Sequence, residues 1–168
     1  MIRILIRGIE GLSGWSGRIA MLFALLLVLI TSFETGERYL FNRSSGVLQE
    51  LTWHLYAAIF LLGFAQTLRE DGHVRVDIFY NRLEPRGRAL INVLSMIFLL
   101  VPFCIMMIGF SWEWVVKSFQ MSERSPDPGG LPALWVLKGL IPLSFGLLLL
   151  QGVAEIFKNW RVLFGKKE

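Results

Sequence analysis

Residues 69–88 read REDGHVRVDIFYNRLEPRGR, a densely charged stretch between two long apolar segments. Charged side chains are costly in hydrocarbon, so this stretch must lie outside the bilayer core if its neighbours cross a membrane. Yet its charges alternate with apolar residues such as Val74, Val76 and Ile78, which a fully solvated loop would not need. The stretch therefore predicts two membrane spans joined by a connection that touches the membrane surface.

Four windows of the chain are long and apolar enough to cross a bilayer, which takes about 20 mostly apolar residues. Hydrophobic residues make up 54% of the chain and charged residues 18%, and the charges crowd between the windows. We predict an all-α integral membrane protein with a single membrane domain over residues 1–168 and no attached catalytic domain. The expected spans are residues 15–33, 51–68, 89–116 and 134–157.

A cleaved signal peptide is the alternative interpretation of the first window, whose start is basic. We favour an uncleaved span, because no small-x-small cleavage pattern follows and no alanine occurs between Ala24 and Ala57.

The positive charges predict the orientation, since Lys and Arg concentrate on the cytoplasmic side. The N-terminal segment, the 69–88 connection and the C-terminal tail together hold twelve of them: Arg3, Arg7, Arg18, Arg69, Arg75, Arg82, Arg86, Arg88, Lys158, Arg161, Lys166 and Lys167. The other two connections hold four: Arg38, Arg43, Lys117 and Arg124. Both termini are therefore expected in the cytoplasm. The net charge of +4 fits attraction to anionic lipid better than nucleic-acid binding, because it is split among segments that flank spans.

Two shorter segments have the apolar spacing of amphipathic helices that lie along a membrane surface. The first is an N-terminal arm over residues 1–14, with its stripe at Ile2, Leu5, Ile9 and Leu12. The second is a cytoplasmic arm over residues 72–84, with its stripe at Val76, Phe79, Tyr80 and Leu83. Pro85 ends the second helix, because a residue before proline disfavours the α region. Such arms either rest on lipid or grip a partner subunit.

No residue pattern indicates an enzyme, a cofactor or a metal site. Cys104 is the single cysteine, which excludes a paired-thiol centre, and it is expected to act as a small core residue. His54 and His73 lie at opposite ends of the second span, so they cannot hold one haem iron. No nucleophile motif or phosphate loop is present. We predict no catalytic, substrate-binding or metal-ligating residues.

The second span carries small and polar residues along one helical face, including Glu50, His54 and Ala58. Such a face lets membrane helices approach closely and form hydrogen bonds. It can pack inside this bundle or against another protein, and a proton relay through Glu50 and His54 is a minor third alternative. In the third span, Pro102 predicts a kink or a wide turn.

Four short segments resemble the small membrane subunit of tripartite ATP-independent periplasmic (TRAP) transporters, the DctQ-like family. They are Arg38-Tyr39-Leu40-Phe41-Asn42, Phe60-Leu61-Leu62-Gly63, Gly72-His73-Val74-Arg75-Val76-Asp77 and Leu140-Ile141-Pro142-Leu143. The resemblance covers nearly the whole chain, in order and with the same topology. It implies a multi-pass protein of the bacterial inner membrane that needs no cofactor.

In that family a periplasmic solute-binding protein delivers the solute to two membrane subunits. The large permease subunit carries the substrate and sodium sites and moves like an elevator, and the small subunit enlarges its static scaffold. The resemblance thus implies a non-catalytic subunit for uptake of an organic solute, such as a carboxylate, with the large permease, the binding protein and membrane lipid as partners. The candidate subunit-interface residues are Glu50, His54, Ala58, His73, Arg75, Asp77, Phe79 and Tyr80.

The sequence is also compatible with two other functions. One is a stand-alone small membrane assembly or lipid-binding protein, and the other is a self-sufficient dimeric carrier. Co-purification with a large membrane partner, and uptake by the chain alone, separate the three hypotheses.

Overall fold

The computed structural model describes residues 2–72, 80, 83–127 and 130–164, and within them it contains helices and no strand. The predicted all-α class is therefore confirmed. The elements in chain order are α1 (Ile2–Phe41), α2 (Gly46–Arg69), α4 (Pro85–Ser95), the π-helical turn η1 (Met96–Leu100), α5 (Val101–Gln120) and α6 (Trp135–Phe164).

Four of the described helical segments are long and apolar enough to cross a membrane, as predicted. They are Arg3–Phe41, Gly46–Arg69, Pro85–Gln120 and Trp135–Phe164. Each expected window falls on one of them, although the fourth window begins one residue before α6. Each helical segment extends beyond its expected window at one end or at both.

The N-terminal arm expected over residues 1–14 is not a separate helix. It continues into the first span as α1, whose 40 residues give a length of about 60 Å, twice the hydrocarbon core of a bilayer. Packing explains the continuity, because Ile6 and Ile9 are buried in a cluster with Ala154 of α6. Leu5 and Leu12, which belong to the apolar stripe expected in this arm, are exposed, at 63% and 52%. The first part of α1 is thus held against the bundle.

Pro102 produces the wide turn that the sequence predicts. A proline has no backbone N–H and cannot make the usual bond to the carbonyl four residues earlier. Just before it, the N–H of Val101 bonds to the carbonyl of Met96, five residues back, and residues 96–100 form η1. The helix therefore changes its hydrogen-bond spacing without breaking, and α4, η1 and α5 make one spanning segment.

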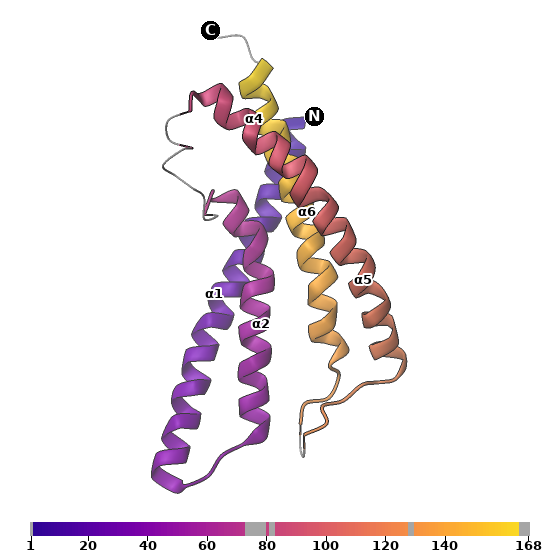
Figure 1. The fold of residues 1–168 in the computed structure, drawn as a ribbon. Coiled ribbons are helices and arrows are strands. Elements are labelled where there is room, and N and C mark those ends of the chain that lie inside the picture. The colour runs from indigo at the N-terminus through magenta and orange to yellow at the C-terminus, as the bar shows by residue number, and fades with distance from the viewer. Residues whose placement is uncertain (1, 73–79, 81–82, 128–129, 165–168) are drawn as a thin grey trace.

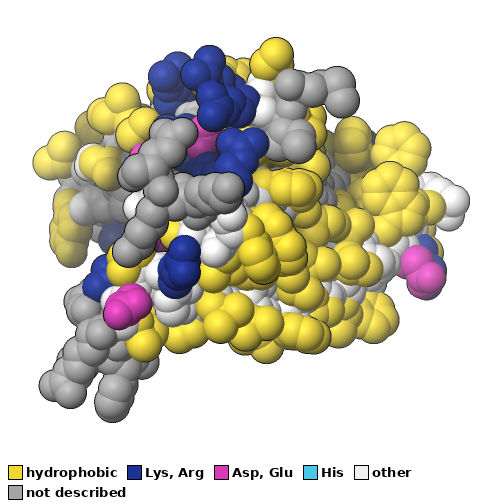
Figure 2. Space-filling model, turned by 90° about the horizontal axis from the view of Figure 1, so that it is seen from above, with side chains coloured by type: hydrophobic (Ala, Val, Ile, Leu, Met, Phe, Trp, Pro, Cys, Tyr) yellow, Lys and Arg dark blue, Asp and Glu magenta, His cyan; other side chains and the backbone are white. Residues whose placement is uncertain are grey.

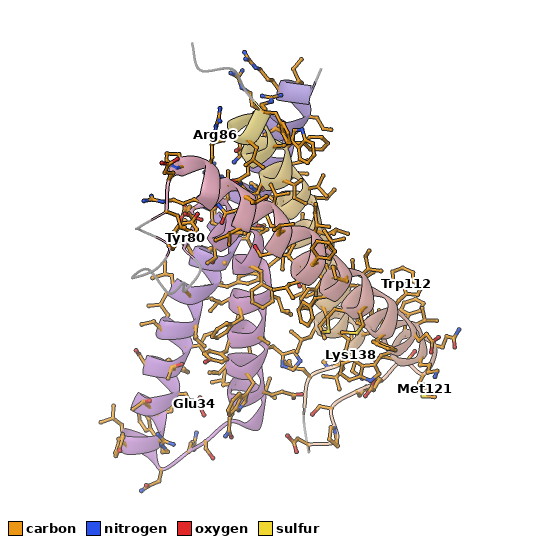
Figure 3. The ribbon with its side chains drawn as sticks, turned by 45° about the horizontal axis from the view of Figure 1, so that its top comes forward. Glu34, Tyr80, Arg86, Trp112, Met121 and Lys138 are labelled. Carbon is orange, nitrogen blue, oxygen red and sulfur yellow. The ribbon has the colours of Figure 1, made fainter. Side chains whose placement is uncertain are left out.

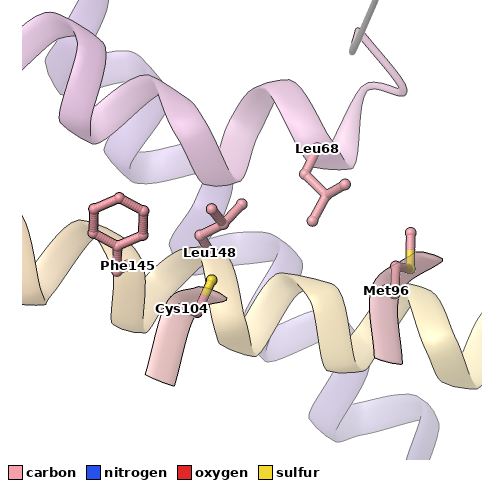
Figure 4. Packing of buried hydrophobic residues seen from close by; sticks show 5 residues of the cluster. All are labelled: Leu68, Met96, Cys104, Phe145 and Leu148. Carbon is pink, nitrogen blue, oxygen red and sulfur yellow. The ribbon is translucent and has the colours of Figure 1, made fainter. Parts of the chain in front are cut away.

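The helices form two antiparallel pairs, α1 with α2 and α5 with α6, which converge at one end and spread apart at the other (Figure 1). Both termini and α4 lie at the convergent end, which we call the termini end, and the opposite end is the far end. Leu68, Met96, Cys104, Phe145 and Leu148 form the main buried cluster between the pairs (Figure 4). Cys104 is completely buried there, as expected of a core residue.

Candidate interface surfaces

The polar stripe on α2 faces its own chain at the far end. A carboxylate oxygen of Glu50 accepts a hydrogen bond from the backbone N–H of Leu131 at 2.7 Å. His54 Nδ1 lies 2.8 Å from the carbonyl oxygen of Glu50, one helical turn earlier. Ala58 is 4% exposed. The three candidate residues thus lie on the side of α2 that faces the rest of the bundle.

The connection between α5 and α6, residues 121–134, is a closed loop in its described part. The N–H of Ser125 donates to the carbonyl of Leu131 at 3.1 Å, and the N–H of Leu134 donates to that of Glu123 at 3.2 Å. With the bond from Leu131 to Glu50, this loop joins the two helix pairs at the far end, where they are otherwise spread apart.

Lys138 and Glu123 form an ion pair at the base of the same loop. Lys138 Nζ also lies 4.3 Å from the ring centroid of Trp114, and Ser118 Oγ donates to Glu123 at 2.5 Å. Lys138 projects from α6 among the side chains of the far end in Figure 3. The hydrogen bond from Lys138, and then that from Ser118, lowers the pKa of the Glu123 carboxyl from its ordinary value of 4.5.

Most of the expected cytoplasmic arm lies outside the described residues, including the candidates His73, Arg75, Asp77 and Phe79. Tyr80 is described, and its hydroxyl donates to the side-chain oxygen of Asn92 on α4 at 3.1 Å. The Arg88 guanidinium lies 5.6 Å from the Tyr80 ring centroid. Glu84 has extended backbone and Pro85 begins α4, in line with the boundary expected before the proline. Figure 3 shows Tyr80 and Arg86 near the start of α4.

A buried polar network, which the sequence did not predict, joins α1 and α6 near the termini end. Ser13 Oγ donates to Gln151 Oε1 at 2.8 Å, and neither side chain is more than 1% exposed. Gln151 Nε2 then donates to Glu155 at 2.9 Å. Lys158 Nζ lies 2.6 Å from Glu155 and 2.5 Å from Glu10. About two helical turns of α6, from Gln151 to Lys158, are thereby fixed to the start of α1.

Arg69 extends the network to α2, because its Nη1 donates to the carbonyl oxygen of Glu10 at 2.9 Å. Gly14 leaves space for this arginine, and a Cβ at that position would collide with the guanidinium. The side-chain amide of Asn92 on α4 also donates a hydrogen bond to the side-chain oxygen of Asn159 on α6 at 3.2 Å. Three spanning segments and α4 therefore meet in polar contacts at the termini end.

Positive charge gathers at the termini end. Figure 2 looks onto this end and shows Lys and Arg side chains clustered above a mostly apolar body. Exposed arginines come from the start of α1, the start of α4 and the end of α6, namely Arg3, Arg7, Arg86 and Arg161. This distribution has the asymmetry that the positive-inside rule describes.

An open groove of about 780 Å³ runs between α1, α2 and α6. Its lining comes from residues 12–23, 54–62, 131–133 and 136–147, and includes the candidates His54 and Ala58. Polar side-chain atoms in this lining come from Trp15, Ser16 and His54, and all other lining side chains are apolar. Ser16 uses its hydroxyl to bond the carbonyl of Ser13 at 2.9 Å. The groove is therefore suited to apolar contact.

Among the described residues, no group of three His, Cys, Asp or Glu side chains comes close enough to hold a metal ion. The polar contacts that the structure does show connect helices to each other or to the loop at the far end. This arrangement supports helix packing.

Comparison with known proteins places the chain in a family. The model of the family "Tripartite ATP-independent periplasmic transporters, DctQ component" matches residues 12–162. A protein of Haemophilus influenzae with the name "Putative TRAP transporter small permease protein" is 29% identical over 108 residues, which is 64% of this chain and 64% of that protein. The family match includes all of the second and third spanning helices and most of the first and fourth. The chain therefore belongs to the DctQ component family of the tripartite ATP-independent periplasmic transporters.

Proposed function

We propose that the chain is a non-catalytic small subunit that scaffolds a large elevator-type permease during binding-protein-dependent uptake of an organic solute. Family membership supports a small membrane subunit of a transporter of the inner membrane. The observation that carries the non-catalytic role is the apolar lining of the groove between α1, α2 and α6. A carboxylate solute would be favoured by a cationic side chain, and the described lining of the groove includes no Lys or Arg.

The rigid termini end supports the scaffold role. A static subunit must hold its shape while its partner moves, and the buried bonds from Ser13 to Gln151 and from Lys158 to Glu10 join distant parts of the chain. Ion coupling, carboxylate transport and solute delivery by a periplasmic binding protein belong to the assembled transporter. We further propose that both termini face the cytoplasm, which the charge at the termini end supports (Figure 2).

The arm over residues 72–84 is proposed as a contact with the large permease. Its charged positions Arg75 and Asp77 lie outside the described residues, so the proposal rests on the sequence pattern. Charge reversal at both positions should impair assembly or uptake and leave membrane insertion intact. Normal uptake by that variant would contradict a docking role for the arm.

Co-purification and reconstitution test the function. Tagged chain, co-expressed with the large permease and extracted in mild detergent, is expected to retain the permease in stoichiometric amounts. Vesicles that contain both subunits should take up solute when the binding protein is added, and vesicles without the chain should not. Failure to retain the permease would favour a stand-alone assembly or lipid-binding protein. Uptake by the chain alone would show a self-sufficient carrier.

A further inference from the structure

The groove between α1, α2 and α6 is long in the direction of the helix axes. Ser13 and Gln151 lie at one depth, because they share a hydrogen bond. The lining begins at Leu12, next to Ser13, and ends at Val136, fifteen residues before Gln151 on α6. At 1.5 Å per residue these fifteen residues correspond to about 22.5 Å. The hydrocarbon core of a bilayer is about 30 Å thick.

The depth of the groove decides between two kinds of occupant. An acyl chain from one leaflet reaches only half of the hydrocarbon core, whereas a transmembrane helix crosses all of it. The groove is longer than half of the hydrocarbon core, which is about 15 Å, so its length fits a helix better than one acyl chain. Its lining also includes the small residues Ser16 and Ala58, and small residues let the backbones of membrane helices approach each other closely.

The most apolar part of α1 has few buried residues, although the start of the helix is held against α6. In its most apolar window only 6% of the residues are buried, compared with 33% in the window of α6. On the groove side, Trp15 and Leu143 remain 64% and 53% exposed. A second helix in the groove would cover both of these walls at once.

His54 supplies a polar contact near the far end of the groove. Its Nδ1 lies 2.8 Å from the carbonyl oxygen of Glu50. A carbonyl oxygen can only accept a hydrogen bond, so Nδ1 carries the proton. In the neutral ring, Nε2 is then an acceptor, and it makes no hydrogen bond to a described residue. A polar donor on an incoming helix would satisfy it.

We propose that this groove receives one transmembrane helix of the large permease, with a donor side chain placed opposite His54. The proposal rests on the proposed function and names the surface that carries it. The helix packs against α1, α2 and α6 together, and so bridges the two helix pairs where they spread apart (Figure 1).

Photo-cross-linking tests the surface. Benzoylphenylalanine replaces either Leu140 or Leu29. Leu140 lines the groove, whereas Leu29 is 57% exposed and is not part of the groove lining. Each variant is co-expressed with the large permease and irradiated in membranes. We expect a covalent complex with the permease from position 140 and none from position 29.

A pair of matched substitutions gives a second readout. Leu140→Trp should fill the groove and reduce the permease retained per tagged chain about tenfold, which corresponds to about 1.4 kcal/mol. Leu29→Trp should leave it unchanged. Circular dichroism and monodisperse elution of each variant alone show whether the bundle still folds.

The outcomes separate this proposal from the proposed function. If the unmodified complex forms but position 140 cross-links only lipid, or both positions cross-link the permease equally, the groove is not the docking surface and the subunit function stands. If the unmodified chain retains no permease, the proposed function fails and the groove proposal fails with it.

Discussion

Ser13 and Gln151 are 138 positions apart in the chain, and in the folded protein their side chains share a hydrogen bond of 2.8 Å in a fully buried position. The bond fixes the depth at which α1 packs against α6. Gln151 passes the contact on to Glu155, which in turn contacts Lys158. Helix register at the termini end is therefore set by polar groups within an otherwise apolar bundle.

A double-mutant cycle should detect the bond between Ser13 and Gln151. Ser13→Ala and Gln151→Leu should each lower the free energy of unfolding by about 1 kcal/mol or more, because each leaves a buried partner unsatisfied. The double variant should lose less than the sum, with a coupling energy of about 0.5–2 kcal/mol. Denaturation in mixed micelles measures this. Ser95→Ala, at an exposed serine, is the control and should show no coupling to Gln151→Leu.

Two glycines of α6 should respond differently to the same substitution. A Cβ at Gly152 would lie 2.5 Å from the Cδ2 of Leu100, whereas a Cβ at Gly146 would meet no atom within 4 Å. Gly152→Val should force the Leu100 side chain to shift, at a cost of about 1–3 kcal/mol in the unfolding free energy. Gly146→Val should cost much less. Equal losses in the isolated chain would contradict the close packing of α6 against η1.

Glu50 should protect the amide of Leu131 from hydrogen exchange. Glu50→Leu removes the acceptor and should raise exchange at this amide, while Glu50→Gln keeps a side-chain oxygen and should raise it less. Exchange measured by mass spectrometry on peptides from residues 121–134 gives the readout. Glu113→Leu, at an exposed position of α5, should leave these peptides unchanged. Identical exchange in the Leu and Gln variants would mean that the side-chain acceptor is not what orders the loop.

Acid should loosen the loop at the far end through Glu123. The pKa of this carboxyl is lowered by the hydrogen bonds from Lys138 and Ser118. A lowered pKa means that the stabilisation is fully present above the ordinary value of 4.5 and is lost as the pH falls through the folded-state pKa. Limited proteolysis of the loop should therefore accelerate below about pH 4.5.

Glu123→Gln tests the assignment of that pH dependence. This variant should be cleaved faster at neutral pH and should show a weaker acceleration in acid than the unmodified chain. Asp127→Asn, at an exposed position of the same loop, should behave as the unmodified chain does. An unchanged acid profile in Glu123→Gln would assign the effect to another group.

The spans were predictable because each depends on local sequence. A bilayer demands about 20 apolar residues in a row, and the windows between charged segments have that length. The wide turn before Pro102 was predictable for the same reason, since a proline removes its own N–H wherever the helix runs. For the polar stripe on α2 the sequence left contact inside the bundle and contact with another protein open, and it did not indicate that Glu50 bonds the loop.

The continuity of α1 could not be predicted from its apolar stripe. The stripe at Leu5 and Leu12 is amphipathic and therefore typical of a helix on a membrane surface. The direction of the helix instead depends on Ile6 and Ile9, which are buried with Ala154 from the other end of the chain. The spacing of apolar residues shows which face of a helix is apolar, but it does not show which element packs against that face.

By itself, the sequence determined the all-α class, the number of spans and the absence of a catalytic pattern, because hydrophobic length, charge and motif spacing are properties of neighbouring residues. Only the tertiary structure decided that Ser13 meets Gln151, that Glu10 meets Lys158 and that an apolar groove remains between α1, α2 and α6. The physical reason is that helices in lipid gain little from hydrophobic burial against each other. Their arrangement therefore depends on close packing and on hydrogen bonds between residues that are distant in the chain.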